Sequence, residues 1–375
     1  MMGSKVLQIC HGYSGPFLDV ASQYTDALTR CGYEVHTVYL TGAPSEEVER
    51  QTGGAVVHFF NRDSRDISGL KIGVIRRIKA LVAKDRYVLC VTHRFKPTFI
   101  ACLATRLPVM AVFHAFGVFQ RRSRRLLACL FRKRLLILGV SDAVRDDIRS
   151  ALGSTRAVVE TFHNRIDIDA ARAQLLGRAQ ARKALAIAED AFVFGNVGRL
   201  HPDKDQECLL RAFAAARNNL PAGSCLVVVG SGRLKSRLHT LAQDLGLSED
   251  DVFWIDYLPN ARRYFRAFDA FVLSSDHEPF GMVVLEAMLA EVPIVATRAG
   301  GVPEILGQDY PLLFPVADAP RLQGALLRVA GMRGEERAEL VAEMERRLKT
   351  RFSFDVAANR MAELIDLLRP LRRDA

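Results

Sequence analysis

One stretch of the chain, 274–306, gathers most of the residues that could do chemistry: SSDHEPFGMVVLEAMLAEVPIVATRAGGVPEIL. It follows an apolar strand, AFVL, and Pro279 ends regular structure there because proline lacks an N–H and restricts the residue before it. A helix is expected from Gly281 to about Ala290. The backbone N–H groups of its first turn have no partner within the helix, and together with the helix dipole they favour an anion. These donors belong to Phe280, Gly281, Met282 and Val283.

Two carboxylates accompany this helix start. Glu278 stands directly before it, and Glu286 follows about two turns later. Carboxylates accept hydrogen bonds from sugar hydroxyls, so a pair placed in this way suits a polyhydroxylated ligand. A lone Glu on a helix is usually a solvated charge. Because the neighbours of Glu286 are apolar, we favour a role in the site. The segment therefore predicts a site for an anionic, polyhydroxylated ligand at the carboxyl end of a strand.

Short apolar runs alternate with amphipathic stretches along the whole chain. Strands are expected at 5–10, 34–40, 55–60, 87–92, 108–113, 135–140, 157–162, 191–197, 224–229, 252–255, 270–273 and 293–296. Helices are expected at 16–31, 69–84, 95–105, 121–132, 142–152, 170–186, 205–219, 233–245, 260–267, 281–290 and 318–331. Apolar strands that alternate with helices indicate an α/β protein with parallel sheets covered on both faces.

Two such runs in series predict two Rossmann-like domains that face a cleft. The expected N-terminal domain is 1–168 and the expected C-terminal domain is 169–352, because the charge of the chain changes near residue 165. An amphipathic pattern restarts near Ser353, so a final helix, 353–375, is expected to pack back on the first domain.

The positive charge of the chain is concentrated in its first half. The net charge is +10, and residues 1–165 alone hold 25 Lys and Arg against 13 Asp and Glu. Two stretches, 71–86 and 121–134, alternate basic and apolar residues at helical spacing. Such helices suit an anionic partner, which can be a membrane surface, a phosphorylated glycolipid or a nucleic acid. The alternative for either stretch alone is a solvated helix face.

Composition excludes several classes of protein. With 375 residues and 49 % hydrophobic residues, the chain is typical of a globular protein of two domains. Seven Cys without a C-x-x-C pair indicate reduced core thiols in a cytosolic protein. The start, MMGSKVLQIC, is too short and too weakly charged for a signal peptide. The longest apolar stretch, 99–119, contains Arg106 and Pro108, so we expect no membrane-spanning helix. GSGRLKS lacks the third glycine of a dinucleotide motif and the spacing of a P-loop.

Several stretches together resemble the retaining nucleotide-sugar glycosyltransferases of family 4, which have the GT-B fold. E-P-F-G-x4-E followed by PIVAT and GGVPEIL is similar to the E-x7-E signature of that family. VGRLHPDKDQECLLRAF (197–213) resembles its GRL…KG segment, and VVVGSGRLKSRLHTLA (227–242) its GxG strand and helix. HGYSGPF (11–17) stands where the family has a glycine-bearing loop. Two positions differ: Asp205 stands where Gly is usual, and Asn164-Arg165-Ile166-Asp167 replaces Asn-Gly-Val-Asp.

The resemblance implies a role for each matching residue. Arg199 and Lys204 would hold the donor diphosphate, Glu286 the ribose hydroxyls and Glu278 the hydroxyls of the transferred sugar. The amides of Phe280 and Gly281, with that of Met282 beside them, would hold phosphate or sugar oxygens. Gly15 would let its loop approach the diphosphate closely, since it has no Cβ. Leu258 matches the segment that reads the nucleobase. For His114, after VMAVF, we favour a catalytic role near the reacting sugar over a structural one.

The expected function is retaining, metal-independent transfer of a hexose from a nucleoside diphosphate sugar, most simply a UDP-sugar, without a further cofactor. The acceptor implied by the family and the charge is a membrane-associated glycolipid or polysaccharide, such as bacterial lipopolysaccharide core. The expected location is the cytoplasm, at the inner face of an anionic membrane. A GDP-sugar-dependent mannosyl- or hexosyltransferase is the alternative. A GT-B sugar-nucleotide epimerase is a remote alternative, because it would lack the E-P-F-G-x4-E spacing. A nucleic-acid-binding protein is another, because Phe131 is the only aromatic residue in 121–134 and the Glu pair would have no role.

Overall fold

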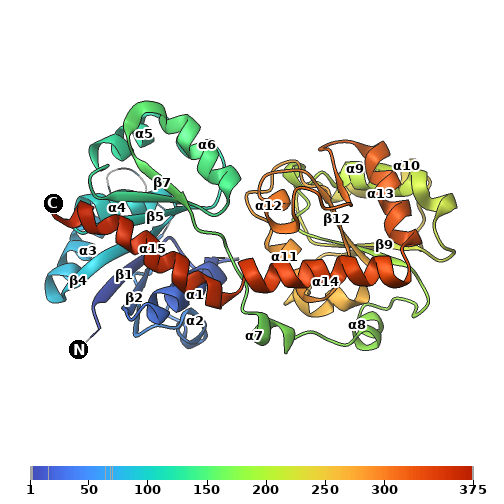
Figure 1. Ribbon diagram of the computed structural model, residues 1–375, viewed down its shortest axis with the longest axis horizontal. Coiled ribbons are helices and arrows are strands. Elements are labelled where there is room, and N and C mark those ends of the chain that lie inside the picture. Colours follow the sequence, from blue (N-terminus) through green and yellow to red (C-terminus); the bar gives the residue numbers. More distant parts are fainter. Residues whose placement is uncertain (1–2, 16, 64, 68, 70, 374–375) are drawn as a thin grey trace. The chain divides into compact units, whose positions relative to one another are not determined.

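The computed structural model describes residues 3–15, 17–63, 65–67, 69 and 71–373. The chain divides into two compact units. Unit 1 contains residues 1–165 and 354–375, and unit 2 contains residues 166–353. Each unit is a parallel β-sheet with helices packed on it, which confirms the expected α/β class (Figure 1).

In unit 1 the described residues form a seven-stranded sheet in the order β3-β2-β1-β4-β5-β6-β7. Its strands are β1 (Lys5–Cys10), β2 (Glu34–Tyr39), β3 (Val56–Phe59), β4 (Tyr87–His93), β5 (Val109–Phe113), β6 (Leu135–Gly139) and β7 (Val158–Thr161). Its helices are α1 (Phe17–Arg30), α2 (Glu46–Thr52), α3 (Ile72–Lys84), α4 (Phe95–Ala104), α5 (Arg122–Leu130), α6 (Asp142–Leu152) and α15 (Phe354–Arg373), with a 3₁₀ turn η1 (Gly153–Thr155).

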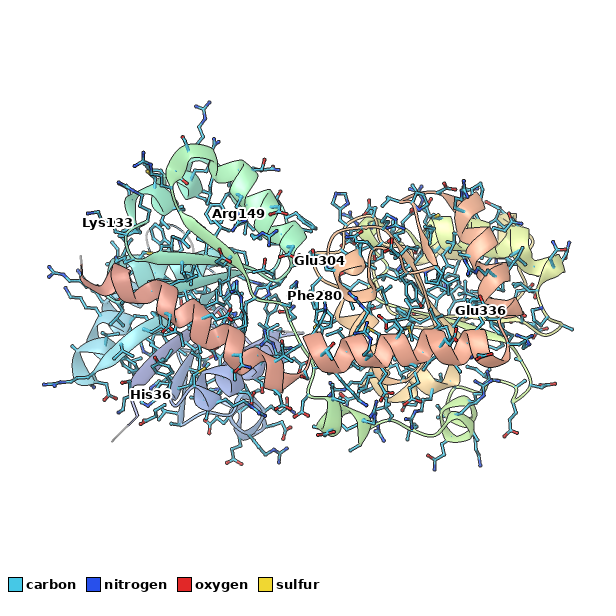
Figure 2. The ribbon with its side chains drawn as sticks, in the orientation of Figure 1. His36, Lys133, Arg149, Phe280, Glu304 and Glu336 are labelled. Carbon is cyan, nitrogen blue, oxygen red and sulfur yellow. The ribbon has the colours of Figure 1, made fainter. Side chains whose placement is uncertain are left out.

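The central strands of unit 1 are buried on both faces because helices cover the sheet on both sides. One buried polar side chain of the sheet is bonded on both sides: His36 on β2, labelled in Figure 2, lies 2.8 Å from the Tyr87 hydroxyl and 2.8 Å from Glu34 Oε1. The last helix, α15, packs against α1. The Cys31 thiol donates to Ala358 O at 3.3 Å and Arg30 pairs with Asp355 at 2.8 Å, so the end of the chain is anchored in the first unit.

In unit 2 the sheet order is β10-β9-β8-β11-β12-β13. Its strands are β8 (Val193–Val197), β9 (Cys225–Val229), β10 (Val252–Ile255), β11 (Ala270–Leu273), β12 (Ile294–Thr297) and β13 (Leu313–Phe314). Its helices are α7 (Ile168–Arg172), α8 (Arg178–Ala184), α9 (Gln206–Ala216), α10 (Lys235–Asp244), α11 (Met282–Leu289), α12 (Val302–Leu306), α13 (Ala319–Gly331) and α14 (Gly334–Arg351). The 3₁₀ turns are η2 (Pro202–Lys204), η3 (Arg217–Asn219) and η4 (Ala261–Ala267).

A buried arginine fastens α8 to the sheet of unit 2. Arg182 is 1 % exposed, and its guanidinium donates to the carbonyls of Ala267 and Ala191 at 3.0 and 2.9 Å. It also pairs with Asp269 at 2.6 Å. A buried charge is tolerated only when it is paired and hydrogen-bonded, so this side chain fixes the start of β11 to the segment before β8.

Each sheet has one point at which the strand order reverses. In unit 1 this point lies between β1 and β4, and in unit 2 between β8 and β11. Loops that leave the carboxyl ends of two such strands diverge to opposite faces, and ligands of open α/β sheets bind in the crevice that opens there. The fold therefore places one candidate site at this edge of each sheet.

Some expected elements differ in the structure. The helix expected over 170–186 is two short helices, α7 and α8, because the chain turns away at 173–177, where Leu176 N donates to Arg263 O at 2.9 Å. The stretch 260–267 is the 3₁₀ turn η4 and not an α-helix. The helix α2 was not expected, since its sequence EEVERQT has little apolar pattern, and Ser45 caps it by accepting from Val48 N at 3.4 Å.

One glycine sets how closely β9 approaches the loop after β8. Gly230 has φ +147°, and a Cβ there would lie 1.8 Å from Gly198 O. We predict that Gly230→Ala destabilises unit 2 by about 3 kcal/mol through strain and a backbone clash. Gly324→Ala in α13 is the control, because a Cβ there meets nothing within 4 Å. Urea unfolding of both variants measures the difference, and equal stabilities would contradict the prediction.

Candidate functional site

The start of α11 lies at the reversal point of the unit 2 sheet. Gly281 is its N-cap with φ 108°, a conformation that favours glycine, and no side chain caps the helix. The loop after β12 holds this start in place, since Gly301 N donates to Glu278 O at 3.0 Å. A Cβ on Gly301 would lie 2.9 Å from the Cα of Phe280. The start of α11 is therefore held close to the loop after β12, and the role of its first-turn amides stays a prediction.

Lys204 and Glu278 meet at this point from two different strands. Lys204 follows β8 and Glu278 follows β11, and the lysine Nζ donates to Glu278 Oε2 at 2.6 Å. Their side chains are only 17 % and 10 % exposed. The Ser275 hydroxyl donates to the same oxygen at 3.3 Å. The structure thus brings together the two predicted residues and also shows that they neutralise each other, which the sequence did not indicate.

The two loops are joined along their backbones as well. The Ser274 hydroxyl donates to Lys204 O at 2.8 Å, and Asp276 N donates to Asp203 O at 3.1 Å. The Thr297 hydroxyl of β12 donates to Ser275 O at 2.5 Å. Two of these contacts join the loops after β8 and β11, and the third joins the loop after β11 to β12, so the backbones that carry Lys204 and Glu278 are held close together.

Arg199 lies in the same loop as Lys204 but is mostly exposed. Its side chain is 71 % exposed and contacts Asp203 Oδ2 at 3.2 Å. Its backbone carbonyl accepts from Gln206 Nε2 at 3.0 Å, which fixes the loop and leaves the guanidinium in water. The Arg199 guanidinium is therefore accessible to an anion from solvent.

The remaining donor-side residues lie on other segments of unit 2. Glu286 is partly exposed on α11, between the buried Leu285 and Ala287. Leu258 is also partly exposed and follows β10, the edge strand of the sheet. Phe280 is buried and contacts the Phe352 ring at 5.9 Å between centroids. The roles assigned to these residues stay predictions.

The local structure explains why Asp205 can stand where the family usually has glycine. Its backbone is left-handed, with φ 43° and ψ 47°, a conformation that favours glycine but that Asp tolerates better than most residues. Its side chain caps α9 by accepting from Cys208 N at 3.3 Å. Burial raises the pKa of this carboxyl. The substitution therefore keeps the turn and adds a helix cap.

Acidic D-x-D triplets, which hold metal in other transferases, occur at 167–169 and 203–205. Their carboxylates are used locally. Asp167 caps α7 by accepting from Ala170 N at 3.0 Å, and Asp203 pairs with Arg199 and His201. Asp167 and Asp203 therefore each have a local structural contact.

The predicted residues of unit 1 lie near the reversal point of its sheet. Gly15 follows β1 and has φ +62°. His114 follows β5, and its Nε2 lies 3.4 Å from Nδ1 of His93. His93 Nε2 in turn lies 3.2 Å from Gln8 Oε1. Burial, and then the Arg94 guanidinium, lowers the pKa of His114 to about 3. Sequence reasoning missed Gln8 and His93, although each is a polar residue within an apolar strand.

Cations gather at the same edge of unit 1. Lys71 and Arg94 are the N-cap residues of α3 and α4, with φ values of 56° and 75°. Lys71 Nζ lies 4.7 Å from the centre of the Phe99 ring, and Arg94 lies 3.5 Å from that of Phe17. Neither forms an ion pair with a described acidic residue. Cations at helix N-termini oppose the helix dipole, so this arrangement favours an anion nearby.

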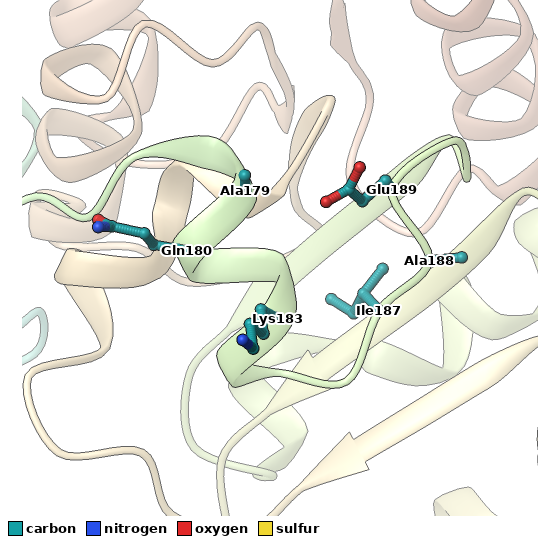
Figure 3. Close-up of a pocket in the computed structure, with 6 residues that line it drawn as sticks. All are labelled: Ala179, Gln180, Lys183, Ile187, Ala188 and Glu189. Atoms are coloured by element: carbon teal, nitrogen blue, oxygen red, sulfur yellow. The ribbon is translucent and has the colours of Figure 1, made fainter.

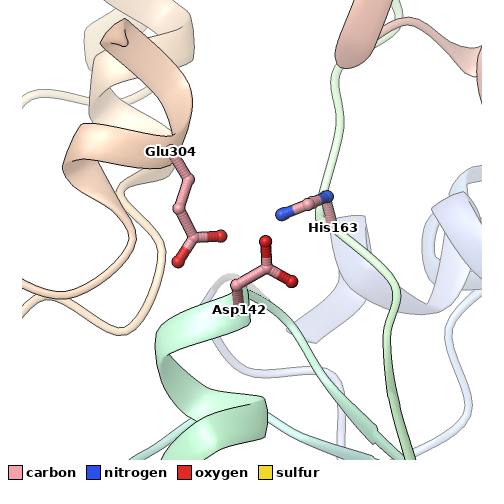
Figure 4. Close-up of side chains that lie close together, drawn as sticks. All are labelled: Asp142, His163 and Glu304. Atoms are coloured by element: carbon pink, nitrogen blue, oxygen red, sulfur yellow. The ribbon is translucent and has the colours of Figure 1, made fainter. Parts of the chain in front are cut away.

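Two other features lie outside these edges. A pocket of about 440 Å³ in unit 2 is lined by α8 and the segment after it, with Lys183 and Glu189 at its rim (Figure 3). In unit 1, Asp142 stands at the start of α6 and accepts from the Thr161 hydroxyl at 2.6 Å, while His163 follows β7 (Figure 4). Glu304, also labelled there, belongs to α12 of unit 2. Among the helices that the structure describes, none is both long and apolar enough to cross a membrane.

Two family models match the chain, one on each unit. "Glycosyltransferase Family 4" matches residues 20–170, and "Glycosyl transferases group 1" matches residues 177–351. Among curated proteins, the D-inositol 3-phosphate glycosyltransferase of Saccharomonospora viridis is 35 % identical over 53 % of this chain and 48 % of its own length. The lipopolysaccharide core biosynthesis glycosyltransferase LpsD of Rhizobium meliloti is 32 % identical over 50 % and 52 %. The chain thus spans about half the length of these relatives.

Solved structures show the same fold across nearly the whole chain. Sucrose-phosphate synthase from Thermosynechococcus elongatus has a TM-score of 0.77 at 19 % identity, and covers 97 % of this chain and 99 % of its own. Anabaena HepE in complex with UDP and glucose has a TM-score of 0.78 at 19 % identity, with the same coverage. With both units matched by family models and the fold matched throughout, the chain belongs to glycosyltransferase family 4 and has the GT-B fold.

Proposed function

We propose that this protein transfers a hexose from a nucleoside diphosphate sugar to a membrane-associated glycolipid or polysaccharide. The observation that carries the proposal is the Lys204–Glu278 pair, 2.6 Å long, beside the uncapped start of α11. A cation and backbone N–H groups suit a diphosphate, and a carboxylate suits sugar hydroxyls. Unit 2 would bind the donor and unit 1 the acceptor.

The donor diphosphate would change the partner of Lys204. A phosphate oxygen offers the ammonium a second anion, so the hold of Lys204 on Glu278 weakens as the ligand binds. Glu278 then accepts hydrogen bonds from the sugar. Arg199 adds a second cation, and the amides of Phe280, Gly281 and Met282 add donors. Glu286 would bind the ribose, and Leu258 would lie against the base.

Bond cleavage places negative charge on the leaving phosphate. Fixed cations stabilise that charge most strongly in the transition state, which is where they accelerate the reaction. In the retaining mechanism, a departing phosphate oxygen takes the acceptor proton on the same face of the sugar. Such a step needs neither a protein base nor a metal, so no cofactor is invoked. His114 of unit 1 would contact the reacting sugar, and Gly15 would let its loop approach the diphosphate.

UDP is the first choice for the nucleotide, because the structural neighbour HepE was solved with UDP and with UDP-glucose. GDP is the second, because a GDP-mannose-dependent mannosyltransferase of Mycobacterium tuberculosis is 32 % identical over 44 % of this chain. The acceptor proposal is supported by LpsD, whose name places it in lipopolysaccharide core synthesis, and by the positive charge of unit 1.

The surface of helix α5 supports the proposal that the protein acts in the cytoplasm, at the inner face of an anionic membrane. Leu126 and Leu130 are 60 % and 67 % exposed and lie one turn apart on the same stripe. Arg122 precedes them on that stripe, and Lys133, labelled in Figure 2, lies in the turn just after the helix ends at Leu130. Exposed leucines between basic residues allow a helix to insert its apolar side at the level of anionic headgroups.

The first prediction concerns donor binding. UDP, GDP or ADP should raise the melting temperature of the wild-type protein, and Lys204→Ala should abolish most of this increase. Glu278→Ala and Lys204→Ala should each lower nucleotide release from the matching nucleotide sugar about a hundredfold, because an interaction with developing charge is lost.

Lys349→Ala is the matched control. It removes an exposed lysine of the same unit whose Nζ forms an ion pair with Glu345 at 2.8 Å. Circular dichroism checks that each variant folds. Wild-type turnover in both site variants would refute the assignment of the site, and the absence of a shift with any nucleotide would refute the donor class.

The second prediction concerns the membrane. At low salt the protein should float with vesicles that contain anionic lipid and not with neutral vesicles. The double variant Leu126→Ser/Leu130→Ser should lose most of this binding, whereas Leu367→Ser, which alters a leucine 44 % exposed on α15, should keep it. Equal flotation with anionic and neutral vesicles would contradict the membrane proposal.

A further inference from the structure

A chain of buried polar side chains crosses the reversal point of the unit 1 sheet. Gln8 lies within β1, His93 ends β4 and His114 follows β5. Gln8 is fully buried and His93 is 2 % exposed. Buried polar side chains in an apolar sheet are costly unless their hydrogen bonds are complete, so the direction of each bond can be worked out.

The amide of Gln8 has only one possible orientation. Its Nε2 lies 3.2 Å from the backbone carbonyl oxygen of Ala21, and a carbonyl can only accept. The atom at that position must therefore be the nitrogen. Nε2 also lies 3.1 Å from the hydroxyls of Thr25 and Thr37, which can turn to accept. The other amide atom, Oε1, is left as an acceptor facing His93.

This orientation decides the tautomer of His93. Its Nε2 lies 3.2 Å from Gln8 Oε1, so Nε2 carries the proton. Burial, and then the neighbouring His114, lowers the pKa of His93 well below its usual value, and the ring is neutral. A neutral imidazole has one N–H only. Nδ1 of His93 is therefore an acceptor.

The same argument continues to His114. Its Nε2 lies 3.4 Å from His93 Nδ1, and two bare nitrogens would leave this contact without a proton, so Nε2 of His114 is the donor. Nδ1 then carries a lone pair. This atom has no hydrogen-bond partner among the residues that the structure describes, and the side chain is partly exposed.

The ring of His114 is also held in place from the sides. It stacks on His93 with centroids 5.6 Å apart and meets the Phe17 ring edge to face at 5.8 Å. The Phe17 ring is itself packed against Arg94, whose guanidinium carbon lies 3.5 Å from the centre of the ring. The direction in which Nδ1 points is therefore set by packing as well as by hydrogen bonds.

We propose that Gln8 and His93 are positioning residues that keep His114 in its Nε2–H tautomer, so that Nδ1 accepts a hydrogen bond from a hydroxyl of the bound sugar. The second half of this proposal rests on the proposed function. The first half concerns the free protein alone. A neutral His114 held in this way donates its only N–H to His93 and can only accept a hydrogen bond from the sugar.

The tautomers can be read directly by nitrogen NMR of the ¹⁵N-histidine-labelled full chain, with His114→Gln and His93→Asn used for assignment. Both rings of the wild-type protein should show a protonated Nε2 and an unprotonated Nδ1, and neither should titrate between pH 8 and 5. A protonated Nδ1 on either ring of the wild-type protein would overturn the proposal without any variant or substrate.

Two substitutions of His93 separate positioning from packing. Phe removes the acceptor that faces His114, and the buried N–H of His114 then lacks a partner, which favours the Nδ1–H tautomer. Asn keeps an acceptor near the place of Nδ1 and should preserve the wild-type tautomer. An unchanged His114 tautomer in His93→Phe would overturn the role of His93.

A kinetic experiment tests the role of Nδ1, with the nucleotide sugar that raises the melting temperature of the protein. His93→Phe should lower kcat/KM about tenfold, as expected for one lost hydrogen bond, while His93→Asn restores most of it and the bound UDP or GDP gives the same melting shift in both. A changed tautomer with unchanged kcat/KM would overturn the role of Nδ1 toward the sugar. If the wild-type protein turns over no nucleotide sugar, the proposed function fails, and the NMR result still decides the tautomer.

Discussion

Parallel strands that are buried on both faces leave polar side chains almost nowhere to lie except at the ends of the strands. Both sheets of this protein largely follow that constraint, because most strand side chains are apolar and the loops leave from the carboxyl edge, and the buried Gln8 within β1 is an exception. The reversal of strand order then concentrates the polar groups further, between β1 and β4 and between β8 and β11. The sites at these edges are consequences of the topology before they are consequences of particular residues.

Within unit 2 the constraint explains why Lys204 and Glu278 are paired. Each follows a strand at the reversal point, each is largely buried, and neither charge would be stable there alone. The two charges of this pair neutralise each other, and Arg199 nearby is exposed and paired with Asp203. A ligand that carries both an anion and hydroxyls can satisfy Lys204 and Glu278 together, whereas a simple anion leaves Glu278 without its partner. The arrangement therefore favours sugar phosphates over phosphate alone.

The sequence predicts the parts of this protein that depend on local rules. The α/β class follows from apolar runs between amphipathic stretches, and the start of α11 follows from Pro279 and Gly281. Contacts between distant segments are not written in any local pattern. The Lys204–Glu278 pair joins residues 74 positions apart, and Gln8 and His93 are 85 apart. The break between α7 and α8 likewise depends on Arg263, which accepts from Leu176 N far along the chain.

The central side chains of the two edges differ in charge, and this bears on the proposed chemistry. In unit 2 the groups are charged and paired, whereas in unit 1 burial and Arg94 keep the imidazole of His114 neutral, with a pKa of about 3. An acid of that strength is almost entirely deprotonated near neutral pH, so His114 cannot supply a proton to a leaving group there. Because the ring is neutral, it does not repel the neighbouring Arg94 guanidinium. Under the proposed mechanism the departing phosphate takes the acceptor proton itself. This step requires no proton transfer from a side chain of either unit.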